Sequence, residues 1–456
     1  MYPPNPPDTG IDRFLMMIVM ILVWGYVLLL LIRLLRRSRP GLAITGPVGL
    51  AFAIRLLFIP AVTDTGFGSS LRGGDEITFL GVAHTIASSS LGSSAWLPFG
   101  HNGLYEILFA FQLRFLGLTV DTMRITDVSL AVIGMTLIIV SVYDLVGPRP
   151  ARLTGWLLAL EPASIFFSQV LHKDPLMMFA SGLVVFGGTK VWRRLDPAGL
   201  LLMAIGGAWA VATRPYAGWF LVGAAVFLTA HAAVRNNQQR GRAVIVLLAV
   251  AGIAVVATPV IIDKTSKQSL QTLQGSQTAN SQAAGTEGNN LALESVNFST
   301  RGAIITNLPQ RIGDLLMRPW PWQIGDPSQR LGVIGTLVAY VAMGFFVLYA
   351  IRLRGRLFDL AGPLIYAWFF LLIAYSLSVG NAGTGFRYRS QLTVLVIATA
   401  VALREVWRRE GVRVAHRSRS VRPARWLPAA SGTYAAPNAG GWRANVARPS
   451  GPGDQS

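Results

Sequence analysis

Residues 71–90, LRGGDEITFLGVAHTIASSS, lie between the second and third long apolar runs and place two neighbouring carboxylates, Asp75 and Glu76, at the edge of a predicted membrane. The apolar residues that follow recur with helical spacing: Phe79, Leu80, Val82, Ala83, Ile86 and Ala87. This pattern predicts an amphipathic helix on the bilayer surface that begins at the acidic pair. The dipole and free N–H groups at a helix start favour negative charge, so a simple helix cap explains the two acids equally well.

Composition identifies a helical membrane protein with many spans. The 456 residues are 52% hydrophobic and 13% charged, whereas soluble domains carry roughly 25% charge. Repeated apolar runs of about 20 residues match the thickness of a bilayer. We therefore expect an all-α polytopic fold with about eleven transmembrane helices. The absence of cysteine from the sequence excludes disulfides, thiolate nucleophiles and cysteine zinc sites.

Basic loops set the predicted orientation of these spans. Arginines stay in the cytoplasm, and they follow the first apolar run closely, so we expect the N-terminus outside and the C-terminus in the cytoplasm. The predicted spans are 13–35, 42–62, 126–146, 153–170, 175–190, 199–213, 216–234, 243–262, 331–351, 360–379 and 390–403.

The same pattern divides the chain into five parts. They are an extra N-terminal span (1–41), a transmembrane module (42–262) with a first external loop (63–125), an external loop (263–330), C-terminal transmembrane helices (331–404) and a basic disordered tail (405–456). Further interfacial helices are predicted at 102–117 and 291–318, and a mobile segment at 264–290. The net charge of +19 does not indicate nucleic acid, because no fold or aromatic pattern accompanies the basic tail.

Ionisable groups gather on the predicted outer side, where such groups at a membrane edge suggest a functional site. They are Asp75, Glu76, His101, Glu106, His172, Lys173, Asp174, Arg214, Arg387 and Arg389. Carboxylates beside arginines suit transfer from a phosphate leaving group. A carboxylate can take the proton of an acceptor hydroxyl, and arginine can hold the phosphate. A divalent cation, Mg²⁺ or Mn²⁺, between Asp75 and Asp174 is a further expectation.

Structural explanations for these charges stay open at this point. The arginines can be ordinary topogenic or snorkelling charge, although topology favours arginine on the inner side. Lys173 and Asp174 can form a local ion pair. Glu161, next to Pro162 within a predicted span, fits a buried hydrogen-bonding group between helices better than a catalytic acid.

The order of these motifs resembles one family of membrane enzymes. The acidic pair and its helix (75–87) precede a Gly-Leu-Tyr helix ending in Leu-Gly (103–117), then Arg124, then EPASIFFSQVLHKDPLMMF (161–179). Together they resemble the polyprenyl-phosphate-sugar-dependent glycosyltransferases of the C superfamily, the group of the protein O-mannosyltransferases and lipid A aminoarabinose transferases. The similarity covers roughly residues 42–214, with a weaker echo at 381–389.

The resemblance implies a seven-helix module in a bacterial plasma membrane with an external active site. The donor would be a sugar on a polyprenyl monophosphate, and the reaction an inverting transfer to a hydroxyl of a glycan, lipid or protein. Asp75 would be the base, Glu76 its support, and Asp174 would act on a metal or the acceptor. The donor phosphate would be held by Lys173, Arg214, Arg387 and Arg389, and support would come from His101, Glu106 and His172. The family's external loop that covers the donor would be 264–318.

Two other functions remain alternatives. An O-antigen-ligase or polymerase-like enzyme would share the external arginines, but it would use a pyrophosphate lipid and would not need the first-loop carboxylates. A lipid flippase or transporter would show inverted repeats and helices broken near the bilayer midplane. The sequence shows no repeat, and Arg55 and Glu161 are the charges placed well inside predicted spans, away from their ends.

Overall fold

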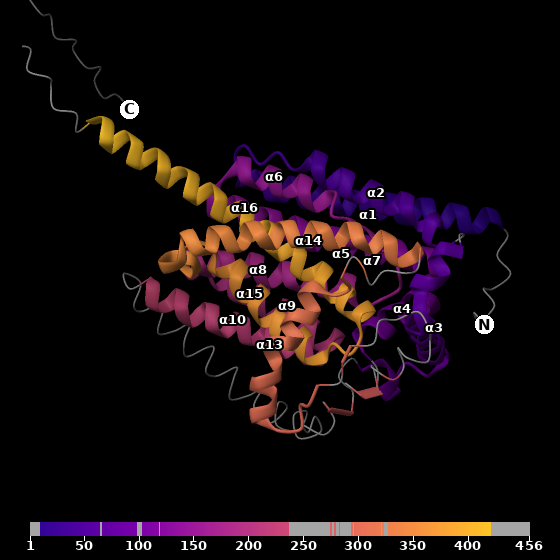
Figure 1. Cartoon of the computed structure of the whole chain (residues 1–456). Coiled ribbons are helices and arrows are strands. Elements are labelled where there is room, and N and C mark those ends of the chain that lie inside the picture. Colours follow the sequence, from indigo (N-terminus) through magenta and orange to yellow (C-terminus); the bar gives the residue numbers. More distant parts are fainter. Residues whose placement is uncertain are drawn as a thin grey trace, which may run out of the picture. The chain divides into compact units, whose positions relative to one another are not determined.

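The computed structural model describes residues 10–63, 66–97, 103–117, 119–236, 274–275, 278–279, 282, 293–294, 296–320, 322 and 327–420. Its elements are α1 (Gly10–Arg37), α2 (Thr45–Thr63), α3 (Gly66–Ser88), η1 (Ser94–Trp96), α4 (Leu104–Leu116), α5 (Val120–Val146), α6 (Pro148–Ala159), α7 (Pro162–Phe167), α8 (Asp174–Arg194), α9 (Pro197–Thr213), α10 (Pro215–Arg235), α13 (Arg301–Met317), α14 (Pro327–Arg352), η4 (Arg354–Arg356), α15 (Leu357–Ser378) and α16 (Ala382–Ser420). Every element among these is a helix, which confirms the predicted all-α class (Figure 1).

Seven helices of the described part are long and apolar enough to cross a membrane. They are Phe14–Arg37, Val120–Val146, Asp174–Arg194, Pro215–Arg235, Gly332–Arg352, Arg354–Ser378 and Ala382–Glu410. Two shorter apolar helices, Thr45–Pro60 and Pro197–Thr213, lie where two further spans were predicted. The predicted span 243–262 falls outside the described residues. A polytopic membrane protein is therefore supported, whereas the number of eleven spans is not confirmed.

The predicted continuous span 153–170 is wrong, because it is divided into α6 and α7. Glu161 ends the run: its carboxylate accepts hydrogen bonds from the first N–H groups of α7, and Pro162 starts that helix. Arg55 of α2, fully buried, donates to the carbonyls that end α6 and to the hydroxyl of Ser164, 2.7 Å away. Both helix ends at the break are thereby satisfied without water.

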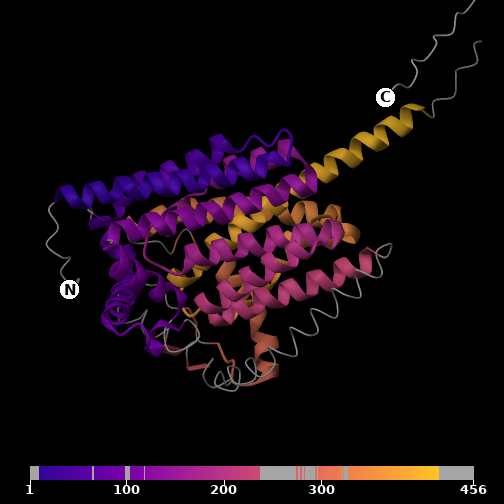
Figure 2. The same cartoon turned by 180° about the vertical axis from the view of Figure 1, so that it is seen from behind.

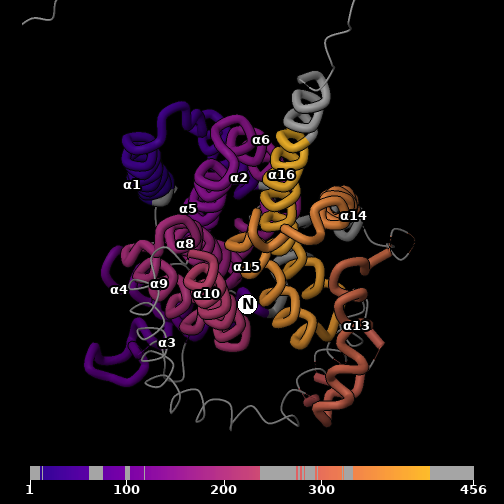
Figure 3. The backbone as a smooth tube through the Cα atoms, turned by 90° about the vertical axis from the view of Figure 1, so that its left-hand side faces the viewer, coloured from indigo at the N-terminus to yellow at the C-terminus, as the bar shows by residue number. Residues whose placement is uncertain are grey.

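The bundle is organised around α5 and α8. The apolar, membrane-spanning stretch of α5 is completely buried in the protein. The helix α8 packs against α5, α9, α10 and α15 (Figure 3). Gly134 of α5 and Gly182 of α8 make this approach possible, since a Cβ on either one would collide with the backbone of the other helix. Asp174 opens α8, so this packing fixes the position of that carboxylate.

The helix α3 begins earlier than predicted and does not lie with its apolar face towards lipid. It starts at Gly66, so Asp75 and Glu76 lie within the helix rather than at its start. Leu80 and Ile86 are buried against a cluster that includes Tyr105 of α4. The two glycines before Asp75 each cost the helix about 1 kcal/mol relative to alanine. The helix nevertheless continues through them, and its later residues pack against the protein.

Other sequence predictions are met in part. The helices predicted at 102–117 and 291–318 exist as α4 and α13, and their place at the interface stays a prediction. Ile305, one of the apolar residues predicted to share a face of α13, is 75% exposed, so the protein does not cover it and its contact with lipid stays a prediction. The tail predicted to be disordered from 405 onward is helical as far as Ser420. Residues 421–456 and most of the segment 264–290 lie outside the described part.

Charged residues predicted to lie on opposite sides of the membrane gather at opposite ends of the bundle. Arg39 and Arg193, both predicted to be inside, contact Asp144 near the end of α5 at N–O distances of 2.8 and 3.5 Å. The helices α5 and α8 run in the same direction, so the start of α8 at Asp174 is at the other end (Figure 2). Which end faces the cytoplasm stays a prediction.

Candidate active site

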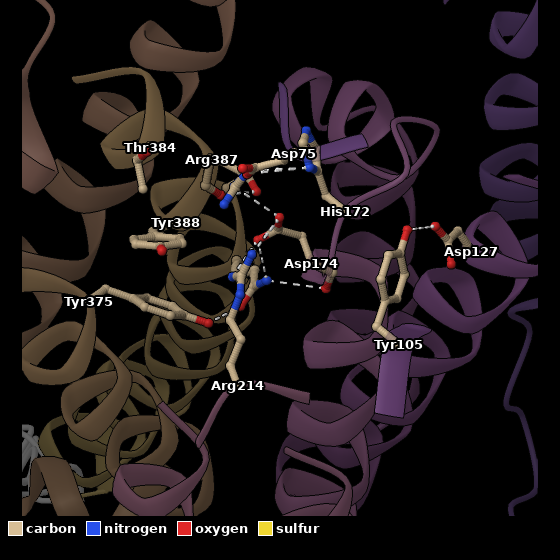
Figure 4. A network of polar contacts seen from close by, with 12 residues as sticks. Asp75, Tyr105, Asp127, His172, Asp174, Arg214, Tyr375, Thr384, Arg387 and Tyr388 are labelled. Atoms are coloured by element: carbon tan, nitrogen blue, oxygen red, sulfur yellow. Dashed lines mark hydrogen bonds and ion pairs between the residues drawn. The ribbon is translucent and has the colours of Figure 1, made fainter. Parts of the chain in front are cut away.

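Arg387 lies between two carboxylates that come from distant parts of the chain (Figure 4). Its Nη1 donates to Oδ2 of Asp75 on α3 at 2.9 Å, and its Nε lies 3.2 Å from Oδ2 of Asp174 at the start of α8. The guanidinium of α16 thus joins α3 to the start of α8. It unites three residues that the sequence analysis singled out separately: the predicted base, the second acid and a predicted phosphate-binding arginine.

Asp174 is held by a second guanidinium from the opposite side. Nη1 and Nη2 of Arg214 donate to its two oxygens at 2.9 and 3.0 Å, the paired geometry that arginine forms with carboxylates. Gln391 adds a hydrogen bond of 2.9 Å to Oδ1. Arg214 stands at the break between α9 and α10, where Pro215 starts the next helix. Burial, the largest single influence, lowers the pKa of Arg214, whereas the carboxylate of Asp174 and the neighbouring tyrosines raise it, and the pKa lies above its ordinary value.

The four charged side chains of this cluster differ in their exposure to solvent. The side chain of Asp75 is 54% exposed, that of Arg387 14%, and those of Arg214 and Asp174 5% and 4%. A ligand approaching from solvent would therefore meet Asp75 first and Arg387 next. Asp174 and Arg214 form the buried floor of this cluster.

A histidine and a group of tyrosines complete the surroundings. Nδ1 of His172 lies 3.3 Å from Nη1 of Arg387, so the histidine expected as support belongs to the cluster. On the other side Arg214 lies over the ring of Tyr388, whose hydroxyl is 2.7 Å from that of Tyr216. Tyr375 stacks on Tyr388 with ring centroids 4.5 Å apart (Figure 4).

The sequence reasoning missed these tyrosines and Gln391. Gln391 follows Arg387 by four residues, a helical spacing that puts both on one face, and this signal was available. Tyr388 stands between two arginines that were singled out. No comparable signal marks Tyr216 or Tyr375, because aromatic residues are common in membrane helices.

Glu76 lies apart from this cluster. It is fully buried and forms an ion pair with Arg124 of α5. Arg124 also donates to the carbonyl oxygen of Gln169 at 2.7 Å, in the loop that leads to Asp174. The Glu76–Arg124 pair therefore ties together α3, α5 and the loop that leads to Asp174. Beside this pair, Tyr105 donates to the buried Asp127 at 2.9 Å, and burial raises the pKa of Tyr105 well above its ordinary value.

Lys173 also takes a different partner from the one considered in the sequence. Its Nζ lies 2.8 Å from Oε1 of Glu106 and 4.8 Å from the centre of the Phe79 ring. Asp174, the next residue, pairs with Arg214 instead. Lys173 and Glu106 thus form a separate pair next to the cluster.

Arg389 faces away from the cluster as well. It is 2% exposed and bonds to the backbone at the end of α13 and to Thr336 of α14. Of the four predicted phosphate-binding residues, Arg214 and Arg387 gather at Asp174, while Lys173 and Arg389 do not. The predicted support His101 lies outside the described residues.

The donor set at Asp75 and Asp174 does not match the expected divalent cation. Both oxygens of Asp174 already accept from Arg214, and Arg387 occupies the space between the two carboxylates. Two guanidinium charges at this position repel a cation. Within the described residues no group of three or more His, Cys, Asp or Glu side chains is arranged to hold a metal. The cation stays a prediction and enters no step below.

No family model matches this chain, and neither a curated protein nor a solved structure was found to match it. The chemistry of the cluster must therefore be argued from its geometry. The half-exposed carboxylate of Asp75 can accept a proton from a hydroxyl. The guanidinium groups of Arg387 and Arg214 beside it can hold an anion.

Proposed function

We propose that the protein is a membrane glycosyltransferase that moves a sugar from a polyprenyl-phosphate donor to an acceptor hydroxyl. The observation that carries the proposal is the contact of Arg387 with Asp75. It joins the accessible carboxylate to the guanidinium next to the buried Asp174–Arg214 pair. A candidate base and a candidate anion-binding group are thus brought into one site, where they can orient the acceptor and the donor.

The proposed reaction begins with an exchange of partners at Arg387. The donor phosphate replaces Asp75 on the guanidinium, because arginine binds phosphate through paired N–H donors. Asp75 is then a free carboxylate within reach of the acceptor. Arg214, kept charged by Asp174, adds positive potential beneath the phosphate.

In the transfer step Asp75 takes the proton of the acceptor hydroxyl as its oxygen attacks the anomeric carbon of the sugar. The bond from that carbon to the phosphate oxygen breaks, and its electron pair leaves with the phosphate. A single displacement of this kind inverts the anomeric configuration. Arg387 stabilises the charge that develops on the leaving phosphate.

The bilayer explains why the donor would be lipid-linked. The described part has seven apolar helices long enough to cross a membrane, and the polar cluster lies at one end of the bundle, so a prenyl chain can stay in the membrane while its phosphate reaches Arg387. We place the protein in a bacterial plasma membrane with this end outside. The acceptor would be a glycan, lipid or protein hydroxyl.

A panel of radiolabelled polyprenyl-phosphate sugars, incubated with the purified protein in lipid nanodiscs, tests the proposal. We expect transfer of label from at least one monophosphate donor, with release of polyprenyl phosphate. Transfer from polyprenyl-pyrophosphate donors alone would replace the proposal with a ligase-like or polymerase-like enzyme. No transfer from either donor class would overturn it.

A second candidate, a lipid flippase or transporter, is favoured by one observation. The break between α6 and α7 places the buried Arg55 and the capping Glu161 at an interrupted helix, a feature of transporter cores. Reconstitution with fluorescent polyprenyl-phosphate lipids decides between the two. Lipid movement that persists in an Asp75→Asn variant would favour transport over transfer.

A further inference from the structure

Arg389 and Arg387 leave α16 on different sides, although one residue separates them. Arg387 points to the two carboxylates, whereas Nη1 of Arg389 donates to the carbonyl oxygens of Leu316 and Arg318 at 3.0 and 2.9 Å. Its Nη2 donates to the hydroxyl of Thr336 on α14 at 2.6 Å. Two of these contacts are with the C-terminal end of α13, and the third is with α14, the next helix in the chain.

These carbonyls are the unpaired end of α13, which carries the negative end of the helix dipole. A guanidinium is suited to this position because it offers several donors and a positive charge. Tyr340 of α14 donates to the remaining carbonyl, that of Met317. Successive carbonyls at 316, 317 and 318 are therefore all held by side chains of the bundle.

The described residues around α13, from 293 to 318, also contact one another. Arg311 donates to the backbone of Glu294 at 2.8 Å and to Asp314 at 3.3 Å, and Arg318 lies 3.1 Å from Asp314. Exposure differs sharply along α13: Ile305 is 75% exposed, whereas Leu315 is fully buried. The packing of α13 on the bundle is thus concentrated at its C-terminal end, where Arg389 lies (Figure 3).

We propose that Arg389 is a positioning residue that docks the end of α13 onto the turn of α16 that carries Arg387. Loss of Arg389 would release the α13 end while the bundle and the Asp75–Arg387–Asp174 cluster stay folded. This docking does not depend on the reaction. Its effect on donor binding rests on the proposed function.

The absence of native cysteine allows a direct test by maleimide labelling of the purified full chain in detergent. Leu315→Cys reports on the docked end of α13, and Ile305→Cys reports on its exposed part. Ala83→Cys, fully buried in α3, reports on the bundle. Each is compared with and without Arg389→Met, and Arg301→Met removes an exposed arginine of the same helix as a matched control.

We expect Arg389→Met to raise the labelling rate at position 315 by at least about tenfold, since several hydrogen bonds from a charged donor are lost. The rates at positions 305 and 83 should stay within about twofold, and Arg301→Met should change none. An unchanged rate at 315 would refute the docking role. Faster labelling at 83 as well would mean that Arg389 supports the whole bundle, which also overturns the proposal.

Milder variants keep the test informative if Arg389→Met fails to fold. Arg389→Lys keeps the charge but has a compact head, and Tyr340→Phe removes one carbonyl contact. Both should give smaller increases at position 315 than the methionine variant, with Ala83→Cys still protected. Equal protection of position 315 in both variants and the parent would contradict the proposal.

A kinetic measurement links the docking to the site. If the transferase assay is active, we expect Arg389→Lys to raise the KM for the lipid donor by about tenfold and to leave kcat within about threefold. An unchanged KM together with faster labelling would confirm docking and remove its link to the donor. If no transfer is found in any protein, the labelling result still decides the docking role by itself.

Discussion

Nη1 of Arg387 lies 2.9 Å from Oδ2 of Asp75, although 312 positions separate the two residues in the sequence. The contact brings α3 and α16 together beside Asp174. Asp75 is exposed, and exposed ion pairs are weak, so an incoming phosphate can take its place on the guanidinium. The relationship therefore supports a substrate-exchange role better than a purely structural one.

Asp75→Asn should abolish sugar transfer without unfolding the protein. The amide keeps the shape but cannot take the acceptor proton, so we expect kcat to fall by roughly 10²- to 10⁴-fold. Asp359→Asn is a matched control, because Asp359 is 53% exposed and faces His231 at the other end of the bundle. A transfer rate in Asp75→Asn equal to that of the parent would show that the base is misassigned.

Arg387→Lys should weaken donor binding. A single ammonium cannot reproduce the contacts of Nη1 and Nε with two carboxylates and a phosphate, so the KM for the donor should rise by about tenfold or more. Steady-state kinetics with varied donor measure this change, and Arg235→Lys, at the other end of the bundle, is the control. A donor KM unaffected by Arg387→Lys would argue against phosphate binding by this residue.

Glu76 and Arg124 should act on stability as a pair. Removing one partner leaves an uncompensated buried charge, so Glu76→Gln and Arg124→Met should each lower the free energy of unfolding by roughly 3–5 kcal/mol. The double variant should lose less than the sum, with a coupling of about 0.5–3 kcal/mol. Denaturation followed by tryptophan fluorescence in detergent gives these values, and strict additivity would contradict the pairing.

Chelation should leave the proposed reaction intact. Arg214 and Arg387 already occupy the oxygens of Asp174, so transfer in excess EDTA should stay within about twofold of the untreated rate. A loss of activity that Mg²⁺ or Mn²⁺ restores would show that the guanidinium groups give way to a metal during catalysis.

Local sequence features predicted much of the architecture. Seven of the predicted spans are found as long apolar helices, because length and hydrophobicity are properties of a continuous segment. The break at Glu161 was missed because hydropathy averages over a window, although Glu-Pro is itself a helix-start signal. The earlier start of α3 was missed because tertiary packing overrides the low helix propensity of glycine.

The sequence alone was likewise enough to select the charged residues predicted for one side of the membrane, because a charged residue next to an apolar run can be read from the sequence. It was not enough to predict which of these residues form pairs. Each residue of a helix is rotated by about 100° from the one before it, so the neighbours Asp75 and Glu76 face different partners. Arg387 and Arg389 are two positions apart, about 200°, and point to nearly opposite sides. Packing sets the rotation of each helix about its axis. That rotation brought Arg387 to Asp75 and Asp174, turned Arg389 to α13, and buried Glu76 against Arg124.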